Sequence, residues 1–273
     1  MTDVFGPFRL TGQTAIVTGG AGLLGAEFCR TLAAAGASVA VLDLDAGKAD
    51  SLATAIRQSG GNALAVVGDV TDSASLRQAV ARTEDDLGEV DILVNSAAKD
   101  PKFDPAHRAA ASNAFEDYPL SLWEEALKVN LTGIFLATQA VVPSMLRQGR
   151  GTIVNICSTY GLVGPDQRIY QAEDRPIQFK PVYYSVTKAG VLGFTRYLAA
   201  YYAGKKIRVN ALTPGGVFHD HDDEFVAAYA SRTILGRMAD QNEMNAALLF
   251  LASEASSYVT GSNLVVDGGW TAW

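Results

Sequence analysis

Short apolar, β-branched runs alternate with helical patterns along the whole chain, and this alternation limits the possible folds more than any other feature. Seven runs have the length and composition of buried strands, at residues 14–18, 38–43, 63–68, 90–95, 151–157, 206–212 and 263–267. Helical patterns separate them, beginning near Gly22, Ala46, Ser73, Ser121, Val182, Asp223 and Gln241. Continuous apolar strands need cover on both faces, so the pattern predicts an α/β fold with a doubly wound, seven-stranded parallel sheet between two helical layers.

The composition fits one catalytic or binding domain spanning residues 1–273. Hydrophobic residues make up 48% of the chain and charged residues 19%, which supplies a large core and excludes a disordered protein. The net charge of −7 argues against a nucleic-acid partner. The two cysteines, Cys29 and Cys157, lie in apolar patterns and are expected to be buried. We find no signal peptide and no uncharged apolar run of membrane-spanning length, and therefore expect a cytoplasmic protein without a membrane partner.

Two connections are longer than is usual in a compact domain, and both follow strands. They are insertions near residues 99–119 and 159–182. Ligands of open α/β sheets bind beyond the carboxyl ends of strands, so we expect both insertions to border a substrate. Each insertion carries basic residues, namely Lys99, Lys102, Arg108, Arg168, Arg175 and Lys180. These residues are either solvated loop charges or a site for a polar or anionic small molecule.

A glycine-rich loop, TGGAGLLG at residues 18–25, joins the first strand to the first helix. Glycines at this position let the backbone approach a pyrophosphate, which the helix N-terminus favours. Asp43 ends the second strand, 18 residues beyond Gly25, near the spacing of a ribose 2′-hydroxyl acceptor. A carboxylate there repels a 2′-phosphate, so NAD is favoured over NADP. The alternative is a tight turn without a ligand.

The pattern Tyr-x-x-x-Lys occurs three times, as Tyr184/Lys188, Tyr201/Lys205 and Tyr202/Lys206. Only the first pair lies within a long helical pattern, where residues four apart share a face. Gly204 is expected to end that helix before the other two lysines. A tyrosine needs roughly 4 kcal/mol of phenolate stabilisation to act as an acid/base near neutrality, and a neighbouring ammonium contributes to it. We therefore predict Tyr184 as the acid/base and Tyr183 as its structural neighbour.

The glycine loop and Asp43 are followed by VNSAA (94–98), KVNLTG (128–133), NICS (155–158) and YSVTK (184–188). With these motifs in this order, the chain resembles the short-chain dehydrogenases/reductases from Gly12 to Gly269. The resemblance implies a Rossmann fold and an oxidoreductase that moves a hydride between nicotinamide and a secondary alcohol or ketone. It implies no metal, and the segment HDHDDE (219–224) is read as part of a polar lid over residues 217–225.

The resemblance also implies roles for individual residues. Asn130 would help to hold a proton-relay water, and Ser158 would orient the substrate oxygen. Tyr184 would exchange the proton, and Lys188 would lower its pKa and hold the nicotinamide ribose. Asp69 would contact the adenine, Asn95 would support the central strand, and residues 214–217 would lie against the nicotinamide. The implied cofactor contacts are Gly19, Gly22, Leu23, Leu24, Gly25, Asp43, Asp69, Val70, Asn95, Ala97, Tyr184, Lys188, Pro214, Gly215 and Val217.

The chain departs from the family pattern at three places. Leu23 stands where the compact members usually have a glycine, giving a spacing more typical of the extended, epimerase-like members. Asn-Ser-Ala-Ala at 95–98 replaces the usual Asn-Asn-Ala-Gly, and Ser158 lies 26 residues before Tyr184, about twice the usual separation. Two other functions therefore remain open: an epimerase- or dehydratase-like enzyme with transient oxidation, and a catalytically silent NAD-binding regulatory protein.

A narrower likeness rests on DPKF (100–103), SNAFEDYPL (112–120), STYG with PDQR (158–168) and the ending GSNLVVDGGWTAW. These segments resemble oxidoreductases of flagellin glycan (legionaminic acid-type) biosynthesis. That likeness implies an amino-sugar derivative as substrate. Family members commonly pair the helices expected at 121–147 and 182–203, so a homotetramer is expected, with a dimer as the second choice.

Overall fold

The seven predicted strands lie side by side in one sheet. The computed structural model describes residues 3–99, 113–171 and 177–273, and its strand order is β3-β2-β1-β4-β5-β6-β7, with every pairing parallel. The strands are β1 (Thr14–Thr18), β2 (Ser38–Asp43), β3 (Asn62–Val67), β4 (Val90–Asn95), β5 (Gly151–Ile156), β6 (Ile207–Pro214) and β7 (Asn263–Val266). The predicted doubly wound α/β fold is confirmed, and the strand order reverses between β1 and β4.

Eight α-helices connect or cover the strands in the described residues. They are α1 (Leu23–Ala34), α2 (Ala46–Gln58), α3 (Ser73–Leu87), α4 (Leu120–Leu127), α5 (Gly133–Gln148), α6 (Val182–Tyr201), α7 (Asp223–Ala230) and α8 (Asn245–Ala252). Aspartates cap three of them: Asp45, Asp72 and Asp222 each accept a backbone N–H of the first turn.

Several predicted boundaries differ from the observed ones by a few residues, and two of the differences have a clear cause. Helix α8 begins at Asn245 and not near Gln241, because Glu243 accepts the N–H of Asp240 and closes a separate turn there. Strand β6 continues to Pro214, two residues beyond the predicted end, because its last residues still pair with β7.

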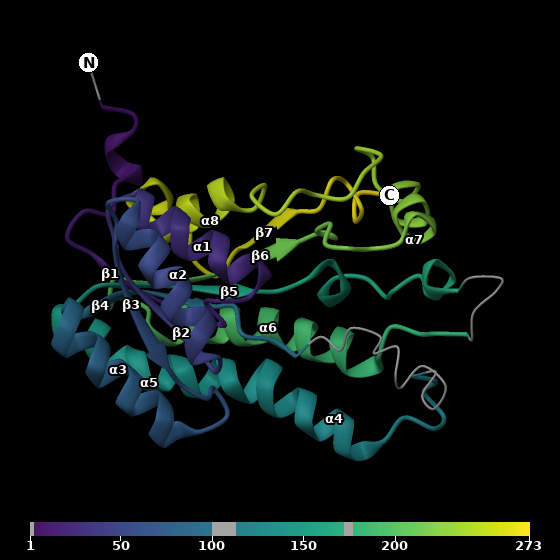
Figure 1. The fold of residues 1–273 in the computed structure, drawn as a ribbon, viewed down its shortest axis with the longest axis horizontal. Coiled ribbons are helices and arrows are strands. Elements are labelled where there is room, and N and C mark those ends of the chain that lie inside the picture. The colour runs from purple at the N-terminus through teal and green to yellow at the C-terminus, as the bar shows by residue number, and fades with distance from the viewer. Residues whose placement is uncertain (1–2, 100–112, 172–176) are drawn as a thin grey trace.

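The sheet separates two hydrophobic layers (Figure 1). Val17 and Val41 face the layer of α1, α2 and α8, whereas Ile16 and Leu42 face the layer of α3, α5 and α6. This alternation is the period of two expected of strands that are buried on both faces. Cys29 and Cys157 are both buried, as predicted.

Helices α4 and α5 are joined through a π-helical turn, η2 (Lys128–Thr132), into one helical segment. By length and composition alone this segment, Leu120–Gln148, is apolar enough to cross a membrane. Half of its most apolar window is buried inside the protein, where α5 packs against β4 and α3. These contacts are those of a core helix.

The second insertion follows β5 and folds into two short 3-10 helices, η3 (Thr159–Gly161) and η4 (Gln167–Tyr170). Helix η4 contacts α7, which follows β6. In Figure 1, α7 and the C-terminus lie together at one end of the molecule, and the N-terminus lies at the other. The carboxyl ends of the central strands therefore share one edge with the insertion, α7 and the C-terminal segment.

Candidate active site

The glycine loop packs so tightly that side chains are excluded at two of its positions. Gly19 has φ +60°, and a Cβ there would lie 2.7 Å from the Cα of Ala97. A Cβ on Gly25 would lie 2.1 Å from the carbonyl oxygen of Gly19. Gly22 forms the N-cap of α1, with Leu23 and Leu24 as its first residues. The backbone amides at this helix start are thus available to an anion, which fits the pyrophosphate of a dinucleotide.

Thr18, which the sequence analysis missed, holds the loop to the next strand. Its Oγ1 accepts the N–H of Ser96 at 3.1 Å and that of Ala97 at 3.2 Å. These bonds join the ends of β1 and β4 at the reversal of strand order. The signal in the sequence was a hydroxyl residue directly before the first glycine.

Asp43 lies at the end of β2, where its carboxylate accepts the N–H of Ala21 at 2.9 Å and that of Asp45 at 3.0 Å. Asp43 therefore helps to orient the glycine loop. Each of its carboxylate oxygens has a second lone pair that can accept a hydrogen bond from a ligand. Asp69 accepts both the N–H and the hydroxyl of Thr71, and these bonds lower the pKa of its carboxyl. Both acids are placed at the carboxyl ends of strands, as the sequence predicted.

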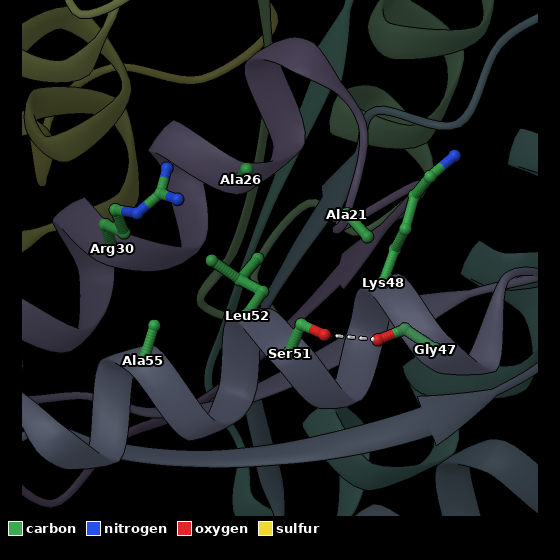
Figure 2. A pocket seen from close by; sticks show the side chains of 8 residues that line it. All are labelled: Ala21, Ala26, Arg30, Gly47, Lys48, Ser51, Leu52 and Ala55. Atoms are coloured by element: carbon green, nitrogen blue, oxygen red, sulfur yellow. Dashed lines mark hydrogen bonds between the residues drawn. The ribbon is translucent and has the colours of Figure 1, made fainter.

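A hollow of about 370 Å³ lies between α1 and α2 and is bordered by Ala21 of the glycine loop. Figure 2 shows the side chains that line it. Two cations line it, Arg30 and Lys48, and each forms an ion pair with a carboxylate of its own helix or cap, Glu27 and Asp45 respectively. None of the four predicted catalytic residues lines this hollow. It borders the outer side of the loop and not the reacting end of the site.

Asn95 is buried at the end of β4 and joins β4 to β5. Its Nδ2 donates to Oδ1 of Asn155 at 2.9 Å and to Oγ1 of Thr138 at 3.3 Å. Asn155 in turn donates to Thr195 on α6 at 2.9 Å. This network ties the helix of the predicted catalytic tyrosine to the centre of the sheet. Val70, also a predicted cofactor contact, is buried against Gly133.

Asn130 lies inside the π-helical turn η2 and is 1% exposed. Its Oδ1 accepts the N–H of Lys99 at 2.6 Å, and its Nδ2 donates to the carbonyl of Lys99 at 3.0 Å. Such π turns occur frequently at functional sites. Here the turn brings Asn130 to the start of the first insertion and holds the chain that leaves β4.

Ser158 follows β5 as the N-cap of η3, and Tyr184 and Lys188 lie on α6. The Oγ of Ser158 accepts the N–H of Tyr160 at 3.3 Å, so its own hydroxyl proton can be donated elsewhere. Lys188 is 5% exposed, and its ammonium donates to the carbonyl of Ile156 at 2.9 Å and lies 5.8 Å from the centre of the Tyr184 ring. Tyr183 is 1% exposed and packs in the core against Tyr118.

Gly161 lets η3 lie directly against α6. A Cβ on Gly161 would approach the Sγ of Cys157 and the carbonyl group of Lys188 to 2.8 Å. The close approach fixes Ser158 and Tyr160 relative to the helix that carries Tyr184.

An aromatic cluster, which the sequence did not reveal, encloses one side of Tyr184. Tyr160 meets the Tyr184 ring edge-on at 6.3 Å and the Trp270 ring at 6.2 Å, and Trp270 stacks on Tyr229 at 4.3 Å. The hydroxyl of Tyr229 accepts the N–H of Gly216 at 2.5 Å, and burial raises its pKa to about 12. Four separate segments of the chain supply this cluster, so no local pattern could have predicted it.

The segment after β6 is clamped between the C-terminal residues and α7. A Cβ on Gly215 would lie 2.7 Å from the Cα of Asp267. Val217 pairs with Ala239 in an isolated parallel bridge. Pro214, Gly215 and Val217 thus lie at the same strand edge as the glycine loop, β4 and α6.

The predicted basic residues of the insertions have different surroundings. Lys99 forms an ion pair with Glu125, and Arg168 binds the carboxylate of Asp166 through two bonds of 2.8 Å. Lys180 places its ammonium 3.9 Å from the centre of the Tyr184 ring. The other three, Lys102, Arg108 and Arg175, lie outside the described residues.

Asp166 links the second insertion to the segment after α7, because Arg232 also forms an ion pair with it. The paired Arg168 guanidinium lowers the pKa of Asp166 to about 2. Among the described residues, no group of three His, Cys, Asp or Glu side chains is arranged to hold a metal ion.

Comparison with known proteins agrees with this geometry. A family profile described as enoyl-(acyl carrier protein) reductase matches residues 19–271. The chain belongs to the short-chain dehydrogenases/reductases. It is 36% identical over 269 residues to D-threitol dehydrogenase of Mycolicibacterium smegmatis (97% of this chain, 95% of the relative). It is 38% identical over 274 residues to galactitol 2-dehydrogenase (L-tagatose-forming) of Cereibacter sphaeroides (97% and 98%).

A solved structure of gluconate 5-dehydrogenase from Burkholderia cenocepacia, in complex with NADP and tartrate, superposes with a TM-score of 0.85 at 32% identity, covering 98% of each chain. The protein is therefore a short-chain oxidoreductase that acts on CH–OH groups with a nicotinamide cofactor.

Proposed function

We propose that this protein is an NAD-dependent dehydrogenase that oxidises a secondary alcohol of a polyol or sugar-derived substrate, or reduces the corresponding ketone. The observation that carries the proposal is the arrangement of Ser158, Tyr184 and Lys188 at the sheet edge where the glycine loop also ends. The nicotinamide, when bound, accepts or supplies the hydride. The remaining chemistry is proton transfer and positioning by side chains of this chain.

In this mechanism Ser158 donates its hydroxyl proton to the substrate oxygen, since its Oγ already accepts the Tyr160 amide. Tyr184 takes the alcohol proton as phenolate and returns it in the reverse direction. Lys188 donates one N–H to the carbonyl of Ile156, which holds its ammonium beside Tyr184, and this ammonium would bind the ribose. The side chain of Asn130 is occupied by Lys99, so a relay water would be held by main-chain oxygens of the π turn.

The proposal of NAD, rather than NADP, rests on Asp43 and Asp45. Both carboxylates lie at the end of β2, and Asp43 is bonded to the glycine loop itself. A 2′-phosphate placed beside them would meet like charge, while the cations Arg30 and Lys48 are already paired. The gluconate 5-dehydrogenase structure was solved with NADP, so cofactor choice must be measured directly.

The substrate proposal has two levels. The threitol, galactitol and gluconate dehydrogenases named above support a polyol or sugar acid. The second candidate is the amino-sugar derivative of surface-glycan biosynthesis suggested by the sequence. Lys180 at the second insertion favours an anionic group on the substrate in either case.

The test is cofactor reduction on a panel of tetritols, hexitols, aldonates and nucleotide-linked amino sugars, with NAD and NADP in parallel. We expect turnover with NAD on at least one polyol or aldonate. Tyr184→Phe should lower kcat by about 1000-fold or more while NAD still binds. Turnover on amino sugars alone would favour the second candidate. Bound cofactor without net reduction on any substrate would instead favour transient oxidation or the silent regulatory protein.

We also propose a cytoplasmic homo-oligomer, with a tetramer preferred over a dimer. Tyr197 and Tyr201 stack on the outer face of α6 at 5.8 Å and are 62% and 66% exposed, and Phe135 on α5 is 46% exposed. Exposed aromatic groups of this kind mark association surfaces. Sedimentation of the wild type and of Tyr201→Ser tests this: a monomeric wild type would reject the proposal.

A further inference from the structure

We propose that Lys180 is a second cation acting on the catalytic tyrosine, supplied by the insertion that precedes α6. The proposal rests on the assignment of Tyr184 as the acid/base. The ammonium of Lys180 lies 3.9 Å from the centre of the Tyr184 ring, closer than that of Lys188 at 5.8 Å. Lys188 lies four residues after the tyrosine, on the same face of α6, whereas Lys180 lies four residues before it, just ahead of the N-cap Pro181.

The backbone of Lys180 is fixed by a side chain from the other end of the insertion. Gln167 accepts the N–H of Lys180 through its Oε1 at 2.8 Å, and its Nε2 donates to the carbonyl of Lys180 at 3.4 Å. Pro181 follows as the N-cap of α6, and the N–H of Tyr184 donates to its carbonyl at 3.1 Å. The bonds between Gln167 and Lys180 therefore join the two described parts of the insertion. They hold Lys180 next to the first turn of α6, the helix that carries Tyr184.

The charge of Lys180 acts on the phenolate more strongly than on the neutral phenol. A cation over a ring is attracted by the quadrupole of a neutral tyrosine, but a full negative charge adds Coulomb attraction at the same distance. An opposite charge within about 4–6 Å favours the charged form of a titrating group. The Tyr184 side chain is half-buried, so water screens the attraction between the Lys180 ammonium and a phenolate less than it would at the surface.

The rings packed around Tyr184 belong to aromatic side chains. Tyr160 of η3 faces the ring edge-on, and its hydroxyl accepts that of Tyr170 at 2.9 Å. Beyond Tyr160 lie Tyr229 of α7, whose burial raises its pKa to about 12 and keeps it neutral, and Trp270.

The two nearby carboxylates of these segments are already engaged. Asp166 forms ion pairs with Arg168 and Arg232. Asp267 accepts the N–H groups of Gly269 and Thr271. Among the described residues, Lys180 and Lys188 are the two cations that lie over the Tyr184 ring, and both favour its ionisation.

The test is an NMR titration with isotope-labelled tyrosine, which needs no substrate. The Tyr184 signal is assigned by its absence in Tyr184→Phe, and its ionisation is followed in wild type, Lys180→Met, Lys180→Arg and Lys205→Met. We expect Lys180→Met to raise the pH of ionisation by about one unit or more. Lys180→Arg should restore most of the shift, and Lys205→Met, in the exposed turn that follows α6, should cause none.

The pH dependence of kcat should move with the titration on any substrate that the wild type oxidises. If Lys180→Met unfolds, Lys180→Gln gives the same comparison. An unchanged ionisation in the Met or Gln variant overturns the proposal, and an accompanying rise of KM for anionic substrates alone would make Lys180 a substrate contact. A clear shift of the Tyr184 ionisation without turnover on any substrate would support the role of Lys180 and reject the dehydrogenase assignment. Failure of the Lys180 proposal and failure of the proposed function therefore give different results.

Discussion

The cofactor side and the substrate side of the candidate site are held together by different kinds of contact. On the cofactor side, residues 18–25 and 95–97 are held by backbone amides, one threonine and glycines that leave no room for a Cβ. On the substrate side, residues 158–171, 177–184 and 218–273 are held by aromatic rings and ion pairs between distant segments. The closely packed backbone of the cofactor side leaves no room for a larger side chain. On the substrate side, a single substitution can remove one ring contact or one ion pair and leave the others in place. The substrate side is thus the side on which specificity can change without loss of the cofactor.

The strongest test of this difference is Gly19→Ala. The alanine would have to adopt the φ of +60° found at Gly19, and its Cβ would lie 2.7 Å from the Cα of Ala97. The glycine loop must therefore move. We expect the Kd for the cofactor to rise about 100-fold or more, which calorimetry or fluorescence can measure. Gly149→Ala is the matched control, with φ +70° and nothing within 4 Å. It should cost about 1 kcal/mol of stability and leave cofactor affinity unchanged. Equal losses of affinity in both variants would contradict the steric explanation.

Gly161→Ala applies the same perturbation to the substrate side. Its Cβ would meet Cys157 and the carbonyl of Lys188 at 2.8 Å and push η3 away from α6, which separates Ser158 from Tyr184. We expect kcat to fall about tenfold to 100-fold, because misplacement by an ångström is costly, while the Kd for the cofactor stays the same. Gly164→Ala, in the same insertion with nothing within 4 Å, should behave as wild type. A loss of cofactor affinity in Gly161→Ala would mean that the two sides are not independent.

The two sides also differ in how far the sequence predicted them. The glycine loop, Asp43 and the Tyr184/Lys188 pair are local patterns fixed by strand and helix periodicity, and the structure brings them to one edge of the sheet. The boundaries of α8 and β6 were missed because a side-chain turn at Glu243 and a strand pairing decided them.

The substrate side depended on contacts that sequence spacing does not encode. Tyr160, Tyr229 and Trp270 meet only after β5, β6 and β7 have paired, so each alone looked like an ordinary aromatic residue. In the sequence, Lys180 was one of six basic residues in the insertions. In the structure, its backbone is bonded to Gln167 and its ammonium lies over the Tyr184 ring.

A smaller effect is expected from Tyr229→Phe, which removes one hydroxyl and leaves the stacked ring. The N–H of Gly216 would lose its acceptor in a partly buried position, which costs about 1–3 kcal/mol. The melting temperature should fall by roughly 2–8 °C, and KM for the substrate should rise more than the Kd for the cofactor. Tyr258→Phe is the control, since Tyr258 is fully exposed. If cofactor binding weakened as much as substrate binding, the Tyr229 hydroxyl would support both the cofactor side and the substrate side. The two sides would then not be independent.

The smallest effect is expected from Asp166→Asn, which removes the link from the second insertion to Arg232. Ion pairs near the surface contribute about 1 kcal/mol or less, so the loss of stability should be of that size and should shrink in high salt. Arg168 lowers the pKa of Asp166 to about 2 in the folded protein, below the ordinary value near 3.9. The bridge therefore stabilises the fold fully above about pH 4 and is lost as the pH falls through 2. Denaturant titrations should show a constant difference between the variant and wild type from neutral pH down to about pH 5, and a narrowing difference below about pH 4. A difference that instead grew on acidification would mean that Asp166 is protonated in the folded protein and that another contact joins the insertion to the segment after α7.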